Sequence, residues 1–146
     1  MNAPIDVYYD ASCPLCRAEI HALVAVDPEQ RLRLHDCSVA GFSDPDALRV
    51  GIDRHRMMQA MHVRDADGRW HAAVGAFVVM YRAVGIESVA AVWAHPWLKP
   101  LWDRIYPFIA RHRMTLSRLG FSRVVRSDRS RGAAARRCAS DACGDR

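Results

Sequence analysis

The stretch Cys13-Pro14-Leu15-Cys16 lies between two segments whose hydrophobic patterns differ. Before it, Ile5-Asp6-Val7-Tyr8-Tyr9 is apolar and partly alternating, which predicts a buried β-strand. After it, apolar residues recur at helical spacing as far as Val26. Asp27-Pro28 ends this pattern, because the residue before a proline avoids helical geometry. The two cysteines therefore stand where a strand ends and a helix begins.

The start of a helix gives the two cysteines different expected roles. Pro14 fits the first helical position, where its missing N–H costs nothing, so Cys13 is the expected N-cap. Unpaired backbone N–H groups and the positive end of the helix dipole favour a thiolate there, and the thiolate is the nucleophile. Cys16 lies one turn further, on the apolar face. We expect an exposed, attacking Cys13 and a more buried, resolving Cys16.

A CxxC motif has other interpretations, because it is also half of many zinc sites and can consist of two inert cysteines. Two further cysteines, Cys138 and Cys143, lie near the C-terminus. They could form a second redox pair, pass electrons to the CxxC motif, complete a four-cysteine zinc site with it, or have no role. The sequence leaves these alternatives open.

Length and composition predict one globular domain. The chain has 146 residues, of which 51% are hydrophobic and 25% charged, as in an ordinary protein with a single core. We expect no signal peptide and no transmembrane segment, because no basic stretch precedes an apolar one and no apolar run approaches about 20 residues. The expected compartment is the cytoplasm, where thiols are mostly reduced. Five cysteines, an odd number, argue against a purely structural set of disulfides.

The net charge of +5 is concentrated at the C-terminal end. Residues 111–146 contain ten Arg against three Asp, whereas residues 1–110 have a small acidic excess. We interpret residues 127–146, which are rich in Arg and Ala, as a flexible basic tail after a single domain of residues 1–126. Few aromatic residues lie among these arginines and no nucleic-acid-binding motif appears, so a nucleic acid partner is not favoured.

Later segments predict a small mixed sheet. Residues 31–35 alternate, which predicts a second strand with its leucines inward, parallel to the first in a βαβ unit. Residues 61–64 and 69–72 flank the turn Asp65-Ala66-Asp67-Gly68 and predict an antiparallel hairpin. A CxxC motif beside a βαβ unit is typical of a thioredoxin-like fold. The predicted fold class is α/β, a thioredoxin-like βαβ-ββα sheet with additional C-terminal helices.

The C-terminal half of the domain has helical periodicity. The pattern predicts helices over residues 74–84, closed by Gly85, over residues 87–94, and over residues 101–119 with a kink at Pro107. Five aromatic residues gather in this part of the chain: Trp93, Trp97, Trp102, Tyr106 and Phe108. We interpret them as core residues, the alternative being a docking surface for a partner protein or for peripheral membrane contact.

The segment Tyr9-Asp10-Ala11-Ser12-Cys13-Pro14-Leu15-Cys16 resembles the N-terminal signature Tyr-Asp-Gly-x-Cys-x-x-Cys of the DCC family of predicted thiol-disulfide oxidoreductases. Three shorter segments are similar to later parts of that family: Met61-His62-Val63, Ala76-Phe77 and Ala110-Arg111-His112-Arg113. The resemblance covers residues 5 to about 119. It implies a thioredoxin-like fold and dithiol–disulfide exchange, with the two cysteines of the motif as the redox pair.

Three positions depart from the patterns that the resemblance implies. Ala11 stands where the family usually has Gly, and Ala73 stands where Gly often precedes the Ala-Phe pair. Thioredoxins place a cis-proline before the strand that faces the CxxC motif, whereas Met57-Met58-Gln59-Ala60 contains no proline. We therefore expect a different groove for the substrate backbone.

Two further residues are candidates for the site. Asp10 could accept the proton of Cys16, or it could cap a turn. The parallel strands bring Asp36 and Cys37 to the edge of the sheet that carries the CxxC motif. Cys37 could be an auxiliary thiol there, or a small core residue.

Together these observations predict an intracellular thiol-disulfide oxidoreductase that needs no organic cofactor. The predicted partners are a disulfide-containing substrate and an external thiol reductant. The competing interpretation is a zinc-stabilised binding module that uses the CxxC motif and the two tail cysteines.

Overall fold

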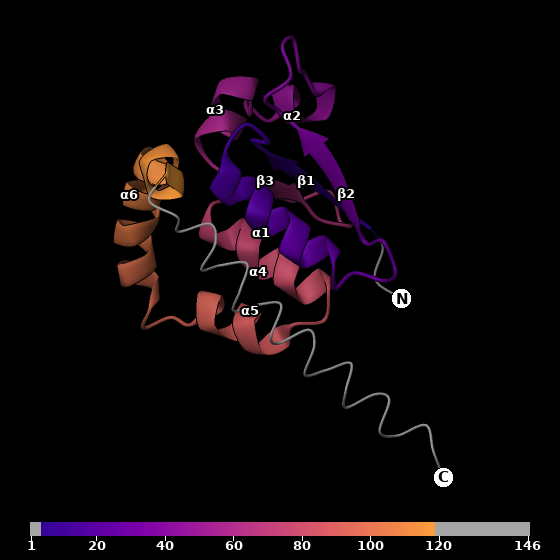
Figure 1. Cartoon of the computed structure of the whole chain (residues 1–146). Coiled ribbons are helices and arrows are strands. Elements are labelled where there is room, and N and C mark those ends of the chain that lie inside the picture. Colours follow the sequence, from indigo (N-terminus) through magenta and orange to yellow (C-terminus); the bar gives the residue numbers. More distant parts are fainter. Residues whose placement is uncertain (1–3, 119–146) are drawn as a thin grey trace.

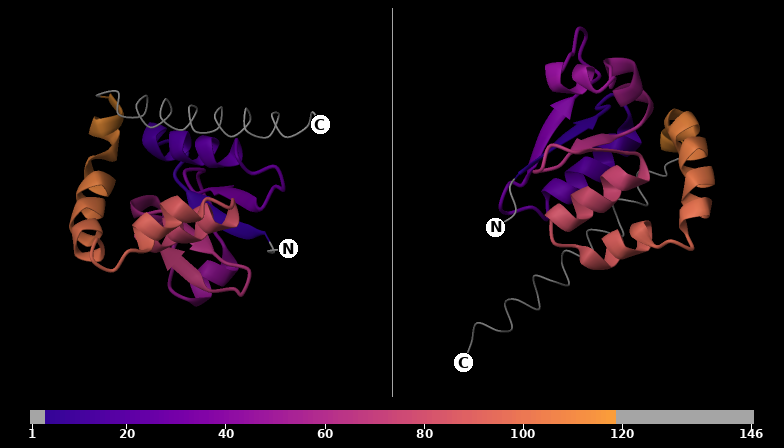
Figure 2. Two further views of the ribbon diagram at one scale, coloured as in Figure 1. Left: turned by 90° about the horizontal axis from the view of Figure 1, so that it is seen from below. Right: turned by 180° about the vertical axis from the view of Figure 1, so that it is seen from behind.

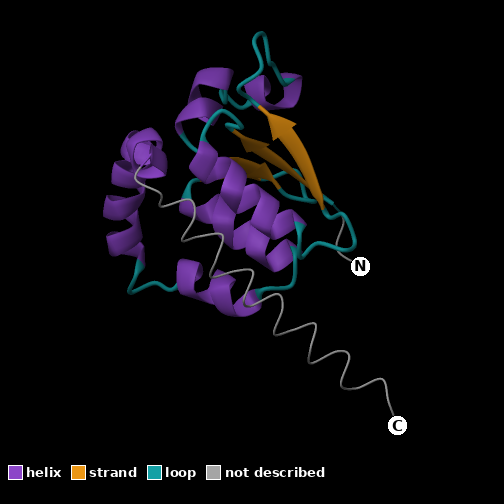
Figure 3. Cartoon of the chain, viewed as in Figure 1, coloured by secondary structure: helices purple, strands orange, loops and turns teal. Residues whose placement is uncertain are grey.

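A mixed four-stranded sheet forms the centre of the protein (Figures 1 and 3). The computed structural model describes residues 4–118. The strands are β1 (Ile5–Tyr9), β2 (Leu32–Asp36), β3 (His62–Arg64) and β4 (Trp70–Ala72), in the order β2-β1-β3-β4. β1 pairs with β2 in parallel and with β3 in antiparallel orientation, and β3 and β4 form the predicted hairpin. This is the predicted thioredoxin-like arrangement.

Helices cover both faces of this sheet. They are α1 (Pro14–Val24), α2 (Pro45–Arg49), α3 (Arg54–Gln59), α4 (Val74–Ala83), α5 (Glu87–Ala94) and α6 (Lys99–Arg118). Successive residues of β1 point to opposite faces. Val7 belongs to the larger core with α1 and α4, whereas Tyr8 belongs to a smaller one with Ala47 of α2 and Met57 of α3.

The parallel register places the ends of β1 and β2 side by side. Ile5 pairs with Leu32 at one end and Tyr9 with Asp36 at the other. The CxxC motif follows β1 and Cys37 follows β2, so both lie at one edge of the sheet, as predicted. The prediction that both leucines of β2 are inward was half wrong, because Leu34 is 39% exposed. β2 is an edge strand, and the helices that bury Leu32 leave Leu34 uncovered.

The helices after the hairpin agree with the predicted pattern. α4 ends at Gly85, whose φ of 76° is the left-handed conformation that glycine adopts at low cost after a helix. α6 contains Pro107, which lacks the N–H of the helical ladder, and Figure 1 shows this helix changing direction along its length. Within residues 4–118, no helix is both long enough and apolar enough to span a membrane.

α6 comes well after the last of the four strands in the sequence, and it lies along one side of the domain, as Figure 2 shows. It packs against α1, α4 and α5. The interpretation of all five aromatic residues as core residues was wrong for two of them, since Trp97 is 86% and Phe108 61% exposed. The domain boundary at residue 126 and the basic tail of residues 127–146 fall outside the described residues.

Candidate active site

Cys13 is the N-cap of α1, in the extended conformation that precedes a helix. Its Sγ accepts a hydrogen bond from the Cys16 N–H at 3.5 Å, and Pro14 takes the first helical position. The Cys13 N–H in turn donates to the Asp10 carbonyl oxygen at 3.2 Å, which tightens the loop after β1. The sulfur therefore lies at the positive end of the helix, as the sequence pattern predicted.

The environment separates the acidities of the two thiols. A hydrogen bond from the Cys16 thiol lowers the pKa of Cys13, against the opposing effect of burial. Backbone N–H groups of Cys16 and Leu15 and the charge of Arg113 lower this pKa further. The same hydrogen bond, together with burial and the nearby Cys13 charge, raises the pKa of Cys16. Both cysteines are free thiols, so the arrangement favours a thiolate on Cys13 and a proton on Cys16.

The solvent exposure of the two cysteines is the reverse of what the sequence predicted. Cys13 has 0% of its surface exposed, whereas Cys16 is only half-buried. The expectation of an exposed Cys13 was wrong because it considered α1 by itself. In the folded protein α6 packs against α1, beside the CxxC motif.

Arg113 of α6 is a residue to which the sequence reasoning assigned no role. Its Nη2 donates to Asp10 Oδ2 at 2.7 Å and to the Met58 carbonyl oxygen at 2.5 Å. The Arg113 side chain is 17% exposed and that of Asp10 only 3%, so the ion pair is largely shielded from water. Arg113 thus ties α6 both to the loop before Cys13 and to α3. The only sequence signal was its place in the short segment that resembles the family.

Asp10 caps a turn, which is one of the two roles that the sequence left open. Its carboxylate accepts hydrogen bonds from the Ser12 N–H at 3.0 Å and the Ser12 hydroxyl at 2.5 Å, which caps the turn. It also pairs with Arg113. Asp36 fixes the same loop from β2, since its Oδ1 accepts the Ala11 N–H at 3.2 Å. Proton transfer between Asp10 and Cys16 stays a prediction.

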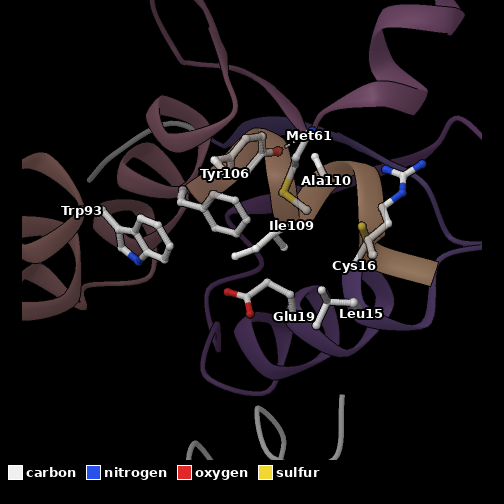
Figure 4. A pocket seen from close by; sticks show the side chains of 10 residues that line it. Leu15, Cys16, Glu19, Met61, Trp93, Tyr106, Ile109 and Ala110 are labelled. Atoms are coloured by element: carbon white, nitrogen blue, oxygen red, sulfur yellow. Dashed lines mark hydrogen bonds between the residues drawn. The ribbon is translucent and has the colours of Figure 1, made fainter. Parts of the chain in front are cut away.

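A cavity of about 190 Å³ opens beside Cys16, between α1 and α6 (Figure 4). Most of its lining is apolar, from Leu15, Met61, Phe77, Trp93, Tyr106 and Ile109. Figure 4 shows Cys16 and Trp93 toward opposite ends of it. The ring of Phe77 stacks on Trp93 with centroids 5.2 Å apart, and the Met61 N–H donates to the Tyr106 hydroxyl at 3.3 Å. The aromatic residues of α5 and α6 therefore build a wall of this cavity.

The family model of the DCC1-like thiol-disulfide oxidoreductases matches residues 7–119, which contain the CxxC motif, Asp10 and Arg113. The chain belongs to this family. Membership of the DCC1-like family indicates a thiol-disulfide oxidoreductase function and agrees with the resemblance seen in the sequence.

One relative of this DCC1-like protein is an uncharacterised chloroplastic protein of Arabidopsis thaliana. The two are 27% identical over 117 residues, which make up 80% of this chain and 54% of the plant protein. The chain thus spans about half the length of that relative. No solved structure matches this chain.

Cys37 lies at the predicted edge of the sheet of the DCC1-like domain, but inside the smaller core. It is fully buried, and its Sγ lies 3.7 Å from Met57 Sδ. Burial and, next, the charge of Asp36 raise its pKa to about 12. A buried thiol that resists ionisation is a poor nucleophile, so this placement favours the core interpretation of Cys37.

Only two of the four ligands of the competing zinc interpretation, Cys13 and Cys16, lie within the described residues. Within residues 4–118, no group of three or more His, Cys, Asp or Glu side chains is arranged to hold a metal ion. Cys138 and Cys143, the other two ligands of that interpretation, lie outside the described residues.

Proposed function

We propose that this DCC1-like protein reduces disulfides, with Cys13 as the attacking thiolate and Cys16 as the resolving thiol. The observation that carries the proposal is the hydrogen bonding of the Cys13 sulfur, which accepts from both the backbone N–H and the thiol of Cys16. These donors stabilise negative charge on Cys13 and keep the proton on its neighbour.

In the first step the Cys13 thiolate attacks one sulfur of a substrate disulfide. A Cys13–substrate disulfide forms, and the other substrate sulfur leaves as a thiolate. Cys16 then loses its proton and attacks the Cys13 sulfur, which forms the Cys13–Cys16 disulfide and releases the second substrate thiolate. Two electrons pass from the protein dithiol to the substrate. The substrate thiolates take up two protons, one from Cys16 by way of Asp10 and one from water.

Asp10 and Arg113 support these steps in different ways. In this proposal the Asp10 carboxylate takes the proton of Cys16 when Cys16 becomes the nucleophile. Arg113 is a positioning residue that fixes Asp10 and adds positive charge near the thiolate. Because Cys13 has no exposed surface, the surrounding side chains must move before a substrate disulfide reaches it.

Trapping of the mixed disulfide tests the proposal. Cys16→Ser protein is incubated with insulin as a protein disulfide, quenched with acid, and digested for mass spectrometry. We expect an insulin adduct on Cys13, because the resolving thiol is missing. Cys37→Ala, which removes a cysteine from the smaller core, serves as the control and should show normal turnover with dithiothreitol.

The same samples separate the redox proposal from the zinc-stabilised module. Reduced wild-type protein is analysed for bound zinc by elemental mass spectrometry. About one zinc per chain, with Cys13 and Cys16 protected from alkylation, would contradict the redox assignment because a closed four-ligand site occupies the thiols. The absence of a Cys13 adduct in zinc-free protein would also contradict it.

A further inference from the structure

Each turnover leaves a Cys13–Cys16 disulfide that an external thiol must reduce, and the structure offers unequal access to its two sulfurs. Cys16 lines the cavity between α1 and α6. Cys13 has no exposed surface and is not among the residues that line this cavity. A small thiol that enters the cavity therefore reaches Cys16 and not Cys13.

The stability of the leaving thiolate also favours attack on Cys16. Attack on Cys16 expels Cys13, whose thiolate is stabilised by the backbone N–H groups at the start of α1 and by Arg113. Attack on Cys13 would instead expel Cys16, whose environment disfavours the thiolate. Thiol–disulfide exchange is faster when the leaving thiol has the lower pKa. Access and leaving-group stability thus both select Cys16 as the sulfur that is attacked.

The lining of the cavity defines what kind of thiol it accepts. Its walls are mainly aliphatic and aromatic, and its volume of about 190 Å³ suits a group the size of a phenyl ring with a short chain. The polar groups at its edge already have partners, since Tyr81 donates to Glu19 at 2.7 Å and Arg113 binds Asp10. An anionic thiol would lose its hydration there without gaining a cation of its own.

We propose that this cavity binds a small, uncharged, apolar thiol, which reduces the oxidised protein by attacking the Cys16 sulfur. The inference rests on the proposed function, because it needs the Cys13–Cys16 disulfide as its substrate.

The reduction balances with two molecules of the thiol. The first thiolate bonds to Cys16 Sγ, the Cys13–Cys16 bond breaks, and Cys13 leaves as a thiolate. The second thiolate attacks the reductant's sulfur in this mixed disulfide. The two reductant molecules leave as a symmetrical disulfide, and Cys16 is released as a thiolate. Cys16 then takes up a proton. Two electrons have passed from the two thiols to the protein.

The test starts from full-length protein oxidised with diamide, in which mass spectrometry has verified the Cys13–Cys16 disulfide. Its reduction is followed by acid quench and alkylation with 2-phenylethanethiol, 2-mercaptoethanol or glutathione. Each rate is divided by the rate of the same thiol on 2,2′-dithiodipyridine, an unrelated small disulfide, which removes intrinsic reactivity. We expect 2-phenylethanethiol to exceed both polar thiols by about tenfold, the effect of filling an apolar pocket. Equal normalised rates would overturn the proposal.

The position of the first adduct is an independent measurement on wild-type protein. Reactions with 2-phenylethanethiol are quenched in acid within the first turnover, and the mixed disulfide is located by peptide mass spectrometry. The proposal predicts the adduct on Cys16. An adduct on Cys13, or none on Cys16, would overturn it even if the rates favour the apolar thiol.

A pair of substitutions on α6 tests the cavity itself. Ala110 lines the cavity, and Ala110→Phe fills part of it, whereas Thr115→Phe adds the same ring to an exposed position of the same helix. We expect Ala110→Phe to lower the rate of reduction by 2-phenylethanethiol about tenfold and to change the rate with 2-mercaptoethanol by less than about twofold. Thr115→Phe should change neither rate. Equal slowing of both thiols would contradict a binding role for the cavity.

Failure of this inference and failure of the proposed function give different results. If diamide produces no Cys13–Cys16 disulfide, the proposed function fails. If the disulfide forms and is reduced equally by all three thiols through Cys13, the proposed function stands and only the cavity assignment is wrong.

Discussion

Arg113 Nη2 lies 2.7 Å from Asp10 Oδ2, which joins α6 to the loop that presents Cys13. The pair is largely buried and 103 residues apart in the sequence. It holds the positive charge of Arg113 near Cys13, where this charge helps to lower the pKa of the thiol.

Substitution of Arg113 should change acidity and access together. In Arg113→Met the positive charge is lost, so the alkylation midpoint of Cys13 should rise by about one pH unit. The same change frees α6 from Asp10, so the limiting alkylation rate at high pH should increase. Arg113→Lys should keep much of the lower midpoint because the charge remains. It should still raise the limiting rate, because the shorter side chain does not place its ammonium group where Nη2 binds both Asp10 and the Met58 carbonyl. Iodoacetamide kinetics with peptide mass spectrometry measure both quantities.

Arg111→Met is the matched control for that experiment. Arg111 is exposed on the same helix, so its replacement should leave the midpoint and the limiting rate unchanged. A general loosening of α6 would raise the limiting rate in both variants and leave the midpoint alone. That pattern would contradict the role assigned to Arg113.

Asp10→Asn should weaken the fold as well as the site. The amide keeps the shape of the side chain but removes the negative partner of a largely buried guanidinium. We expect a loss of about 2 kcal/mol in the free energy of unfolding, measured by urea denaturation. Stability within about 0.5 kcal/mol of the wild type would show that the ion pair is not structural.

Cys37→Ala should show whether Cys37 is a core residue or an auxiliary thiol. Cys37 is fully buried against Met57, so its truncation leaves a small cavity and should cost about 1 kcal/mol of stability. Disulfide turnover should stay within about twofold of the wild type, because the buried thiol takes no part in exchange. A loss of turnover larger than the loss of folded protein would restore the auxiliary role.

Ala73→Gly should stabilise the protein. Ala73 has a φ of 53° and a ψ of −123°, a conformation that disfavours any side chain with a Cβ. Relief of this strain should raise the free energy of unfolding by about 1 kcal/mol. Ala72→Gly, at the neighbouring position in β4, should lower it by a similar amount because glycine loses more entropy on folding. A destabilised Ala73→Gly would argue against the backbone conformation at this position.

The parts of the fold that were predicted correctly are those with local signals. The N-cap position of Cys13 followed from a strand, a proline and a helical period within about 20 residues. Gly85 ended α4 for a similar local reason. The strain at Ala73 could be anticipated only as a departure from the family pattern, since the sequence carries no measure of φ.

The features that the sequence did not predict depend on contacts between distant segments. The role of Arg113 arises from the position of α6 relative to α1, which is set by tertiary packing. The cavity beside Cys16 has the same origin, because its walls come from α1, α4, α5 and α6. Hydrophobic periodicity assigned residues to helices, but it could not tell which aromatic side chains line a cavity and which, like Trp97, remain exposed.

The pH dependence of Cys13 alkylation, measured in the reduced wild-type protein and in Cys16→Ala, tests the assignment of Cys13 as the attacking thiolate. We expect Cys13 to react at a pH well below that of a free thiol. Because a lowered pKa means that the thiolate persists to lower pH, reactivity should fall only when the pH drops through that lower value. Cys16→Ala should shift the profile to higher pH because it removes the side-chain donor to the Cys13 sulfur. A Cys13 profile centred near the ordinary thiol value of about 8.5, unchanged in Cys16→Ala, would contradict this assignment.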